Sequence, residues 1–315
     1  MFVTRKNKNL FAALTATTLL VTTAACSPQT QAAGSDQVQV LAAFYPLAFV
    51  AEQIGSERVS VTTLTPAGAE PHDLELAPAH TRKIGEADLV LFQTAFQPAV
   101  DEAVRARDPK NVIDSAHLAT LALDPEHSHG DEEGGEDDHD HDHGPNDPHF
   151  WLDPELLSSY AGEVAEELST LDPAGATEYA ANLEQLQLSL ENLDQDYSDG
   201  LATCKTRSIV LTHAAFGYPA QRYDFDQIAI IGVDPEAEPS PAKLKNVAAT
   251  IGELGIDTIF FETLVSPKVA QTLAGDLGVS TQVLDPIEGL TEPDTSYFTI
   301  MESNLDALRT GMQCS

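Results

Sequence analysis

The feature that most constrains the fold of this chain is the alternation of short apolar stretches with segments of helical periodicity. The stretches with strand character are Gln37–Phe44, Arg58–Thr65, Asp88–Gln93, Ser208–Thr212, Gln227–Ile231, Asp257–Phe261 and Thr281–Leu284. Segments with apolar positions three or four residues apart lie between several of them. Short apolar strands that alternate with helices predict an α/β fold built on parallel sheets.

The predicted helices lie on both sides of one long central segment. They are Tyr45–Ile54, Pro78–Gly85, Pro154–Ser169, Lys243–Leu254, Pro267–Leu277 and Tyr297–Met312. The central segment, Ala174–Ala202, has leucines at helical spacing and no proline, which predicts one amphipathic helix about 40 Å long. We therefore expect two parallel-sheet α/β lobes, residues 37–170 and 204–315, joined by a single linker helix within residues 171–203.

Residues 1–25 have the order of a secretory signal peptide. Three basic residues precede an apolar stretch from Leu10 to Val21, and small residues follow it. About a dozen apolar residues are too few to span a bilayer. The sequence before Cys26 resembles the lipobox of bacterial lipoproteins, although Thr23 stands where Leu is usual. We expect Cys26 to carry lipid and residues 26–36 to form the anchor and tether. Ordinary secretion with a free Cys26 is the alternative.

The chain is strongly acidic, with 50 Asp and Glu residues against 16 Lys and Arg residues and a formal net charge of −34. Residues 1–25 carry three basic and no acidic side chains, so the remaining chain has a charge of about −37. A field of this sign repels nucleic acid and attracts cations. We therefore expect no nucleic-acid partner.

Residues 124–147 interrupt the α/β pattern. They include eleven acidic residues, no Lys or Arg, and the histidines His127, His129, His139, His141 and His143. Nothing in this segment can fill a core, so we expect a weakly ordered loop. Imidazoles among carboxylates form weak, exchanging metal sites, and we expect the loop to act as an auxiliary metal-binding segment. A solvated insertion without such a role is the alternative.

Four ligand-type residues stand apart from this loop. His72 follows a predicted strand, His149 lies just after the acidic loop, His213 ends the strand at 208–212, and Asp285 follows the strand at 281–284. Ligands of open α/β sheets collect beyond the carboxyl ends of strands, so these side chains could meet in the cleft between the lobes. Each residue taken singly could equally be a hydrogen-bonded loop residue, and spacing alone does not decide between the two.

The sequence motifs around these residues are a more specific indication of function than their spacing. The motifs are Gly-Ala-Glu-Pro-His-Asp at 68–73, Asp-Pro-His-Phe-Trp-Leu-Asp-Pro at 147–154, Thr-His-Ala-Ala-Phe-Gly-Tyr at 212–218 and Phe-Phe-Glu-Thr-Leu-Val-Ser-Pro-Lys at 260–268. In this order they resemble the ZnuA-type family, the zinc- and manganese-binding proteins of ABC importers. The resemblance extends from about residue 38 to residue 312. The long helical connection and the acidic, His-rich loop are also similar to this family.

The resemblance implies a ligand set for one metal ion. His72, His149 and His213 would bind it through imidazole nitrogens, and a carboxylate or water would complete the shell. Asp285 matches the family's fourth position best. Glu288 competes with it, because some zinc-binding relatives place a Glu near there. Glu70 is a third candidate, because some relatives have an acid directly before the first His.

The donor types favour zinc as the bound and transported ion. Three imidazoles and one oxygen suit tetrahedral zinc, whereas manganese prefers more oxygen ligands. Manganese-binding members of the family usually have Glu at the position of His213. The resemblance thus implies a zinc-binding protein that serves the permease and ATPase subunits of an ABC importer, with manganese as the alternative ion. We expect an extracytoplasmic monomer held at the cell membrane by its lipid.

Two functions from other classes compete with this interpretation. A zinc hydrolase needs an open coordination position and a general base, and the sequence has no His-Glu-x-x-His pair. A surface adhesin is the second, because some members of the family were first described as adhesins. We expect a carrier that is not an enzyme and has no catalytic residues.

The cysteines provide a further constraint. If Cys26 carries lipid, Cys204 and Cys314 remain as an even pair in an oxidising compartment, which favours a disulfide. It would pin the C-terminal helix to the second lobe, with Cα atoms about 4.4–6.8 Å apart. Two unrelated buried thiols are the alternative.

Overall fold

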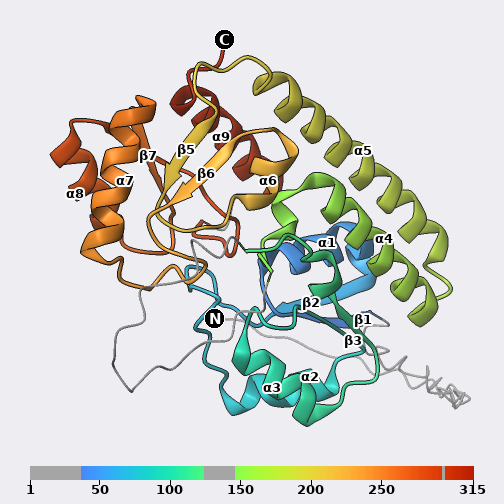
Figure 1. Cartoon of the computed structure of the whole chain (residues 1–315). Coiled ribbons are helices and arrows are strands. Elements are labelled where there is room, and N and C mark those ends of the chain that lie inside the picture. The colour runs from blue at the N-terminus through green and yellow to red at the C-terminus, as the bar shows by residue number, and fades with distance from the viewer. Residues whose placement is uncertain (1–36, 124–145, 293–294) are drawn as a thin grey trace, which may run out of the picture. The chain divides into compact units, whose positions relative to one another are not determined.

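The computed structural model describes residues 37–123, 146–292 and 295–315, which contain two four-stranded parallel sheets (Figure 1). The first sheet has the order β2-β1-β3-β4, and the second has the order β6-β5-β7-β8. The strands are Val38–Ala42 (β1), Val59–Thr63 (β2), Leu89–Phe92 (β3), Val112–Asp114 (β4), Ser208–Leu211 (β5), Asp226–Ala229 (β6), Thr258–Phe261 (β7) and Ser280–Val283 (β8). The predicted fold class, two parallel-sheet α/β lobes, is confirmed.

The helices surround these sheets. They are Tyr45–Gly55 (α1), Pro78–Glu86 (α2), Pro98–Arg107 (α3), Pro154–Leu171 (α4), Ala176–Gly200 (α5), Gly217–Arg222 (α6), Pro241–Leu254 (α7), Lys268–Leu277 (α8) and Tyr297–Gly311 (α9). Short 3-10 turns are Ser56–Arg58 (η1), Ser115–Leu118 (η2) and Phe150–Leu152 (η3). The predicted signal peptide, Cys26, the tether and the five loop histidines lie outside the described residues.

Local sequence explains where many of these elements begin and end. Strand β3 is buried along its whole length, as expected for a parallel strand covered on both faces. Proline occupies the first turn of α1, α2, α3, α4 and α7, where its missing N–H is not needed. Asp153, Ser240 and Ser296 cap α4, α7 and α9 by accepting hydrogen bonds from backbone N–H groups. Gly255, with a φ of +65°, ends α7 in the left-handed conformation.

All seven predicted strands are present, with ends that differ by a residue or two from those expected. Strand β4 and helices α3 and α6 were not predicted. Strand β4 has only three residues and helix α6 only six, too few for a periodic pattern to show. Helix α3 has the sequence PAVDEAVRAR, in which just Val100 and Ala103 are buried, so its apolar face is narrow.

Helix α5 connects the two lobes. Its 25 residues correspond to about 37 Å, and it packs against α1 and α4 of the first lobe and α9 of the second (Figure 1). Leu186, Leu190, Leu193 and Tyr197 form its buried face within one hydrophobic core that also includes residues of both lobes. A smaller core lies between β5, β7, α7 and α8. The shared core therefore joins the two lobes.

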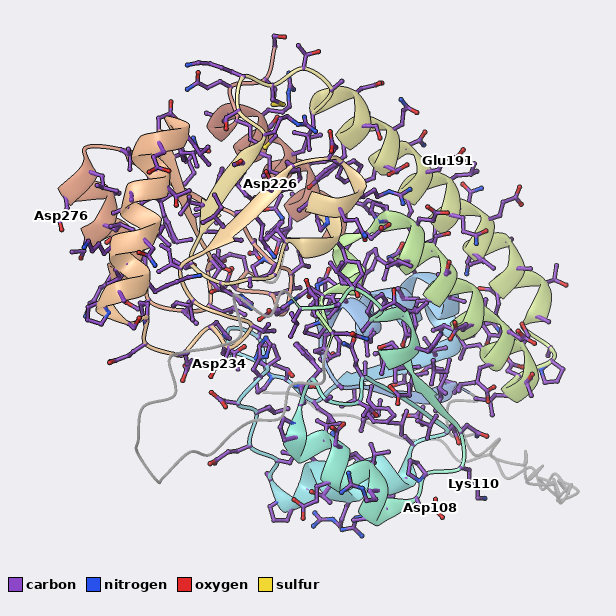
Figure 2. All side chains as sticks on the ribbon, in the orientation of Figure 1. Asp108, Lys110, Glu191, Asp226, Asp234 and Asp276 are labelled. Atoms are coloured by element: carbon purple, nitrogen blue, oxygen red, sulfur yellow. A yellow bond between two sulfur atoms is a disulfide. The ribbon has the colours of Figure 1, made fainter. Side chains whose placement is uncertain are left out.

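The outer surface carries much of the acidic charge. Glu191 on α5 and Asp276 on α8 project away from the sheets (Figure 2). None of the helices in the described part of the chain combines the length and the hydropathy that a membrane span requires.

The predicted disulfide between Cys204 and Cys314 is present. The Cα–Cα distance is 3.8 Å, shorter than the expected range. The two cysteines form an isolated antiparallel bridge, and hydrogen bonds at Ser315 N–Thr203 O and Lys205 N–Gln313 O flank it. Cys204 and Cys314 are therefore a non-hydrogen-bonded antiparallel pair, the type in which opposing Cα atoms approach most closely.

Replacing Cys204 and Cys314 together by Ser should lower the free energy of unfolding by about 2–5 kcal/mol, because the unfolded chain would regain the entropy of a long closed loop. The two cysteines are 110 positions apart. Urea denaturation of the variant, and of the parent protein with and without reductant, measures the change. An unfolding free energy that is the same in all three samples would contradict the stabilising role of the bridge.

Candidate metal centre

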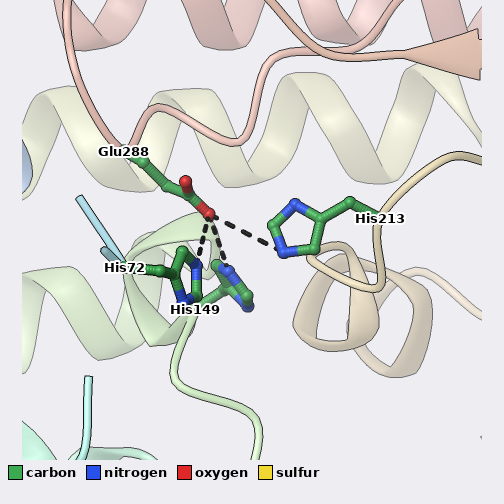
Figure 3. Close-up of side chains that lie close together, drawn as sticks. All are labelled: His72, His149, His213 and Glu288. Carbon is green, nitrogen blue, oxygen red and sulfur yellow. Dashed lines mark hydrogen bonds and ion pairs between the residues drawn. The ribbon is translucent and has the colours of Figure 1, made fainter. Parts of the chain in front are cut away.

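Three histidines and one glutamate meet between the lobes. His72, His149, His213 and Glu288 each offer one donor atom, and all four atoms lie within 4.8 Å of one another (Figure 3). The four side chains are almost completely buried, with at most 3% of any residue exposed. The structure therefore brings together all three of the histidines that the sequence singled out.

Each donor reaches this point from a loop that follows a strand or opens a helix. His72 follows β2, and His213 lies just beyond the end of β5. His149 precedes the 3-10 turn η3, which leads into α4. Glu288 lies in the loop after β8. The carboxyl ends of strands from two separate sheets thus face one another across the site, the arrangement expected for ligand binding in α/β folds.

One carboxylate oxygen lies at the centre of the group. Oε1 of Glu288 is 2.9 Å from Nε2 of His149, 3.3 Å from Nε2 of His72 and 3.8 Å from Nε2 of His213. Among the described residues, Nε2 of His213 and Oε2 of Glu288 are buried and make no hydrogen bond. Buried polar atoms are nearly always satisfied, so Nε2 of His213, which lies 3.8 Å from Oε1 of Glu288, points to a ligand at this position. A metal ion bound by this nitrogen would satisfy it.

Two further carboxylates accept hydrogen bonds from Nδ1 of His149 and of His213 and so orient these two imidazole rings. Oδ1 of Asp147 accepts hydrogen bonds from Nδ1 of His149 at 2.7 Å and from its backbone N–H at 2.9 Å. Oε2 of Glu262 accepts a hydrogen bond from Nδ1 of His213 at 3.0 Å. A carboxylate on Nδ1 fixes the ring with Nε2 turned toward the other donors, and it would raise the basicity of that nitrogen toward a metal ion.

Asp147 and Glu262 were not predicted as site residues, although both lie in the sequence motifs around the ligand histidines. An acid two residues before a ligand histidine could have indicated Asp147. Glu262 is 49 positions from His213, and only the pairing of β5 with β7 brings them together.

The other two fourth-ligand candidates lie outside the group. Oδ1 of Asp285 accepts a hydrogen bond from the backbone of Ile287, and its Oδ2 accepts one from the Thr263 hydroxyl. The two carboxylate oxygens of Glu70 accept hydrogen bonds from the backbone N–H groups of His72 and Asp73. Both acids hold loops that carry donors, whereas Glu288 occupies the position among the imidazoles.

Aromatic side chains exclude water from one side of the site. Phe44 and Trp151 are fully buried with ring centroids 5.0 Å apart, and Trp151 lies 5.2 Å from the ring of His149. Phe96, which the sequence analysis did not single out, lies 4.6 Å from the ring of His72. These rings lower the local dielectric constant, which strengthens every electrostatic interaction among the donors.

The burial and the charges determine where protons reside. Burial lowers the pKa of His213, but the carboxylates of Glu262 and Glu288 raise it more, to about 9. Burial and the neighbouring carboxylates act in the same opposing way on His149, whose pKa is raised. The pKa of His72 is lowered by burial. Burial raises the pKa of Glu288, but the surrounding imidazoles hold it well below its usual range. Without metal, the buried carboxylates therefore favour protons on His149 and His213.

A protein family and several known proteins resemble this chain along most of its length. The model of the family described as periplasmic zinc-uptake complex component A (ZnuA) matches residues 40–311. The zinc-binding lipoprotein AdcA of Streptococcus pneumoniae (strain ATCC BAA-255 / R6) is 34% identical over 292 residues, covering 90% of this chain and 57% of AdcA. The high-affinity zinc uptake system protein ZnuA of Bacillus subtilis (strain 168) is 30% identical over 289 residues, covering 87% of each chain.

Solved structures are similar as well. The Zn(II)-bound ZnuA-like domain of Streptococcus pneumoniae AdcA has a TM-score of 0.71 and 31% sequence identity, and the match covers 88% of this chain and 99% of that domain. The present chain thus spans 57% of the length of AdcA but nearly all of its ZnuA-like domain.

Metal affinity should rise with pH. Below about pH 9 the buried His213 carries a proton that an incoming divalent ion must displace, so the apparent affinity should fall roughly tenfold per pH unit between pH 8.5 and 6.5. The stability of the metal-free protein should change in the opposite direction and fall as the pH rises. The folded pKa of His213 exceeds its usual 6.5, so the stabilisation by its proton is complete below 6.5 and is lost as the pH rises through about 9.

Calorimetric titrations in buffers of different ionisation enthalpy measure the protons released on metal binding. We expect at least one proton per ion at pH 7. An affinity that is independent of pH over this range would contradict the proton balance described above.

Proposed function

This chain belongs to the ZnuA family of periplasmic zinc-uptake components, and on that premise we propose that it captures Zn²⁺ outside the cytoplasm and delivers it to an ABC importer. The names of its relatives, a zinc-binding lipoprotein and a zinc uptake system protein, support this proposal. The main support for this proposal is the buried group of four donors. Their chemistry selects the ion, whereas the fold alone does not determine which ion is bound.

The composition of the donor group favours zinc over manganese. Three imidazole nitrogens and one carboxylate oxygen, from His72, His149, His213 and Glu288, make the four-donor set that zinc binds tetrahedrally. The donor atoms lie within 4.8 Å of one another, so small shifts bring all four to about 2.0–2.2 Å from one ion. Manganese would find too few oxygen donors among these four side chains.

A carrier fits this site better than an enzyme does. A catalytic zinc keeps one coordination position for water or substrate, whereas four protein donors close the shell. The buried site has donors on both lobes, so the ion is enclosed and not presented to a substrate. We propose that the protein binds its ion stoichiometrically and performs no hydrolysis.

The remaining proposals concern partners and location. The protein would dock as a monomer on the permease of the importer, whose ATPase subunits drive uptake. Lipid on Cys26 would hold it at the outer face of the cell membrane, with residues 26–36 as the tether. The histidines of the acidic loop, His127 to His143, would gather zinc loosely and pass it to the buried site. The strong negative charge of the chain favours such collection of cations.

Metal competition combined with substitution tests the main proposal. Metal-free protein given equal zinc and manganese should retain one equivalent of zinc. His72→Ala, His149→Ala and His213→Ala should each weaken zinc binding by at least about tenfold, because a buried shell that lacks one imidazole must recruit water. Chelator-competition titrations measure these affinities.

His117→Ala is the matched control. His117 lies outside the donor group, pairs with Glu163 at 2.8 Å, and has a side chain that is 52% exposed. Its removal should leave zinc affinity within error of the parent protein. Unchanged affinity in any of the three ligand variants, or preferential retention of manganese, would refute the proposed site.

Deletion of residues 126–144 should remove weak zinc sites and leave the tight site intact. None of the four donors lies in this segment, and it has no apolar side chains to contribute to a core. A zinc titration of the deletion variant should therefore show the high-affinity transition alone. Loss of that transition would mean that the segment belongs to the primary site.

A further inference from the structure

The backbone just before Glu288 adopts a conformation that its own residue disfavours. Ile287 has a φ of +59°, in the left-handed region, and its side chain is fully buried. Six non-glycine residues in the described part of the chain have a positive φ, and Ile287 is the only one of them with a β-branched side chain. Such a residue is a steric outlier there, so neighbouring groups must hold it in place.

Asp285 makes the hydrogen bonds that hold this turn. Its Oδ1 accepts the backbone N–H of Ile287 at 2.8 Å, which closes an Asx turn over Pro286. Its Oδ2 accepts the hydroxyl of Thr263 at 2.9 Å. Thr263 directly follows Glu262, the residue that orients His213. The same carboxylate therefore links the loop of the fourth donor to the strand end that supports the third histidine.

Asn304 of α9 fixes the backbone of Asp285 on both sides. Asn304 is buried, with 2% of the residue exposed. Its Nδ2 donates to the carbonyl oxygen of Asp285 at 2.7 Å, and its Oδ1 accepts the backbone N–H of Asp285 at 2.9 Å. The main chain at Asp285 is thus clamped by a buried amide, and its side chain has little freedom to turn toward the imidazoles.

The first lobe holds the same loop from the other side. Nε1 of Trp151 donates to the carbonyl oxygen of Pro286 at 2.7 Å. The backbone N–H of Gly68 donates to the carbonyl oxygen of Leu290 at 2.8 Å. The main chain is thus bound at Pro286 and at Leu290, on either side of Ile287 and Glu288.

We propose that Asp285 is a positioning residue that holds Ile287 in the left-handed conformation and thereby presents Glu288 to the three imidazoles, without contacting the metal itself. The inference rests on the proposed zinc function. It requires the acceptor oxygen of Asp285 and not its negative charge. An Asn side chain keeps an acceptor of the same reach and offers an amide to Thr263, whereas Ala has neither group.

Zinc affinities of Asp285→Asn and Asp285→Ala test this assignment. Asp285→Asn should bind zinc within about threefold of the parent protein. Asp285→Ala should bind at least about tenfold more weakly, the usual size of the effect when the support of a metal ligand is removed. Equal losses in the two variants would show that the charge acts on the metal directly. Parent-like affinity in Asp285→Ala would show that the turn does not need Asp285. Either result overturns the proposal.

A double-mutant cycle separates positioning from a general loss of structure. If Asp285 acts through Glu288, Asp285→Ala should cost less than about twofold in zinc affinity when Glu288→Ala is already present. A further tenfold loss in that background would overturn the proposal. Thermal unfolding of the metal-free variants identifies any that have not folded.

Substitution of Ile287 gives a test that does not depend on the Asp285→Ala variant alone. Gly adopts the left-handed conformation freely, whereas Ala removes nearly the same side chain and keeps the Cβ that resists it. In the Asp285→Ala background, Ile287→Gly should recover zinc affinity roughly threefold or more over Ile287→Ala. Equal affinities of the two double variants would contradict a role for the left-handed turn.

The outcomes also distinguish this inference from the proposed function. If His72→Ala and Glu288→Ala bind zinc as tightly as the parent protein, the site itself is wrong. If those two variants lose affinity and Asp285→Ala does not, the site stands and the positioning role of Asp285 is refuted.

Discussion

The approach of three imidazole nitrogens to one buried carboxylate oxygen of Glu288 is the interaction on which the rest of this structure depends. Such a group is unstable in a dry interior unless positive charge balances the carboxylates. In the metal-free protein protons provide that charge, as the raised pKa values of His149 and His213 indicate. Under the proposed function, a divalent ion would replace those protons and bind all four donors. The donors and their charges would then be arranged for a cation before one binds.

The fold supplies these donors in two pairs. His72 and His149 belong to the first lobe, and His213 and Glu288 belong to the second, so any movement that separates the lobes divides the donor set. The shared core under α5 and α9 opposes such a movement. The hydrogen bond from Trp151 to Pro286 crosses between the lobes directly beside the donors. The same contact between the lobes would therefore both enclose a bound ion and fix the geometry of its four donors.

Much of this arrangement was predictable from the sequence, because strand ends carry their neighbours to one edge of a sheet. Alternating apolar strands indicated two parallel sheets. The positions of the three histidines left open whether they would meet, and it was the resemblance of the surrounding motifs to the ZnuA-type family that implied a shared site. The choice between Asp285 and Glu288 was not predictable. It depends on a left-handed turn at Ile287, a residue whose type gives no sign of that conformation. The pairing of Glu262 with His213 likewise arises from strand order, which local sequence does not reveal.

Zinc K-edge X-ray absorption of the protein loaded with one equivalent of zinc tests the central claim most directly. The account predicts four nitrogen and oxygen donors at about 2.0–2.1 Å, with outer-shell scattering from three imidazole rings. Glu288→Gln should alter the oxygen contribution and leave the imidazole scattering in place. A six-coordinate, oxygen-rich shell, or scattering from fewer than three imidazoles, would contradict a buried site made of three histidines and Glu288.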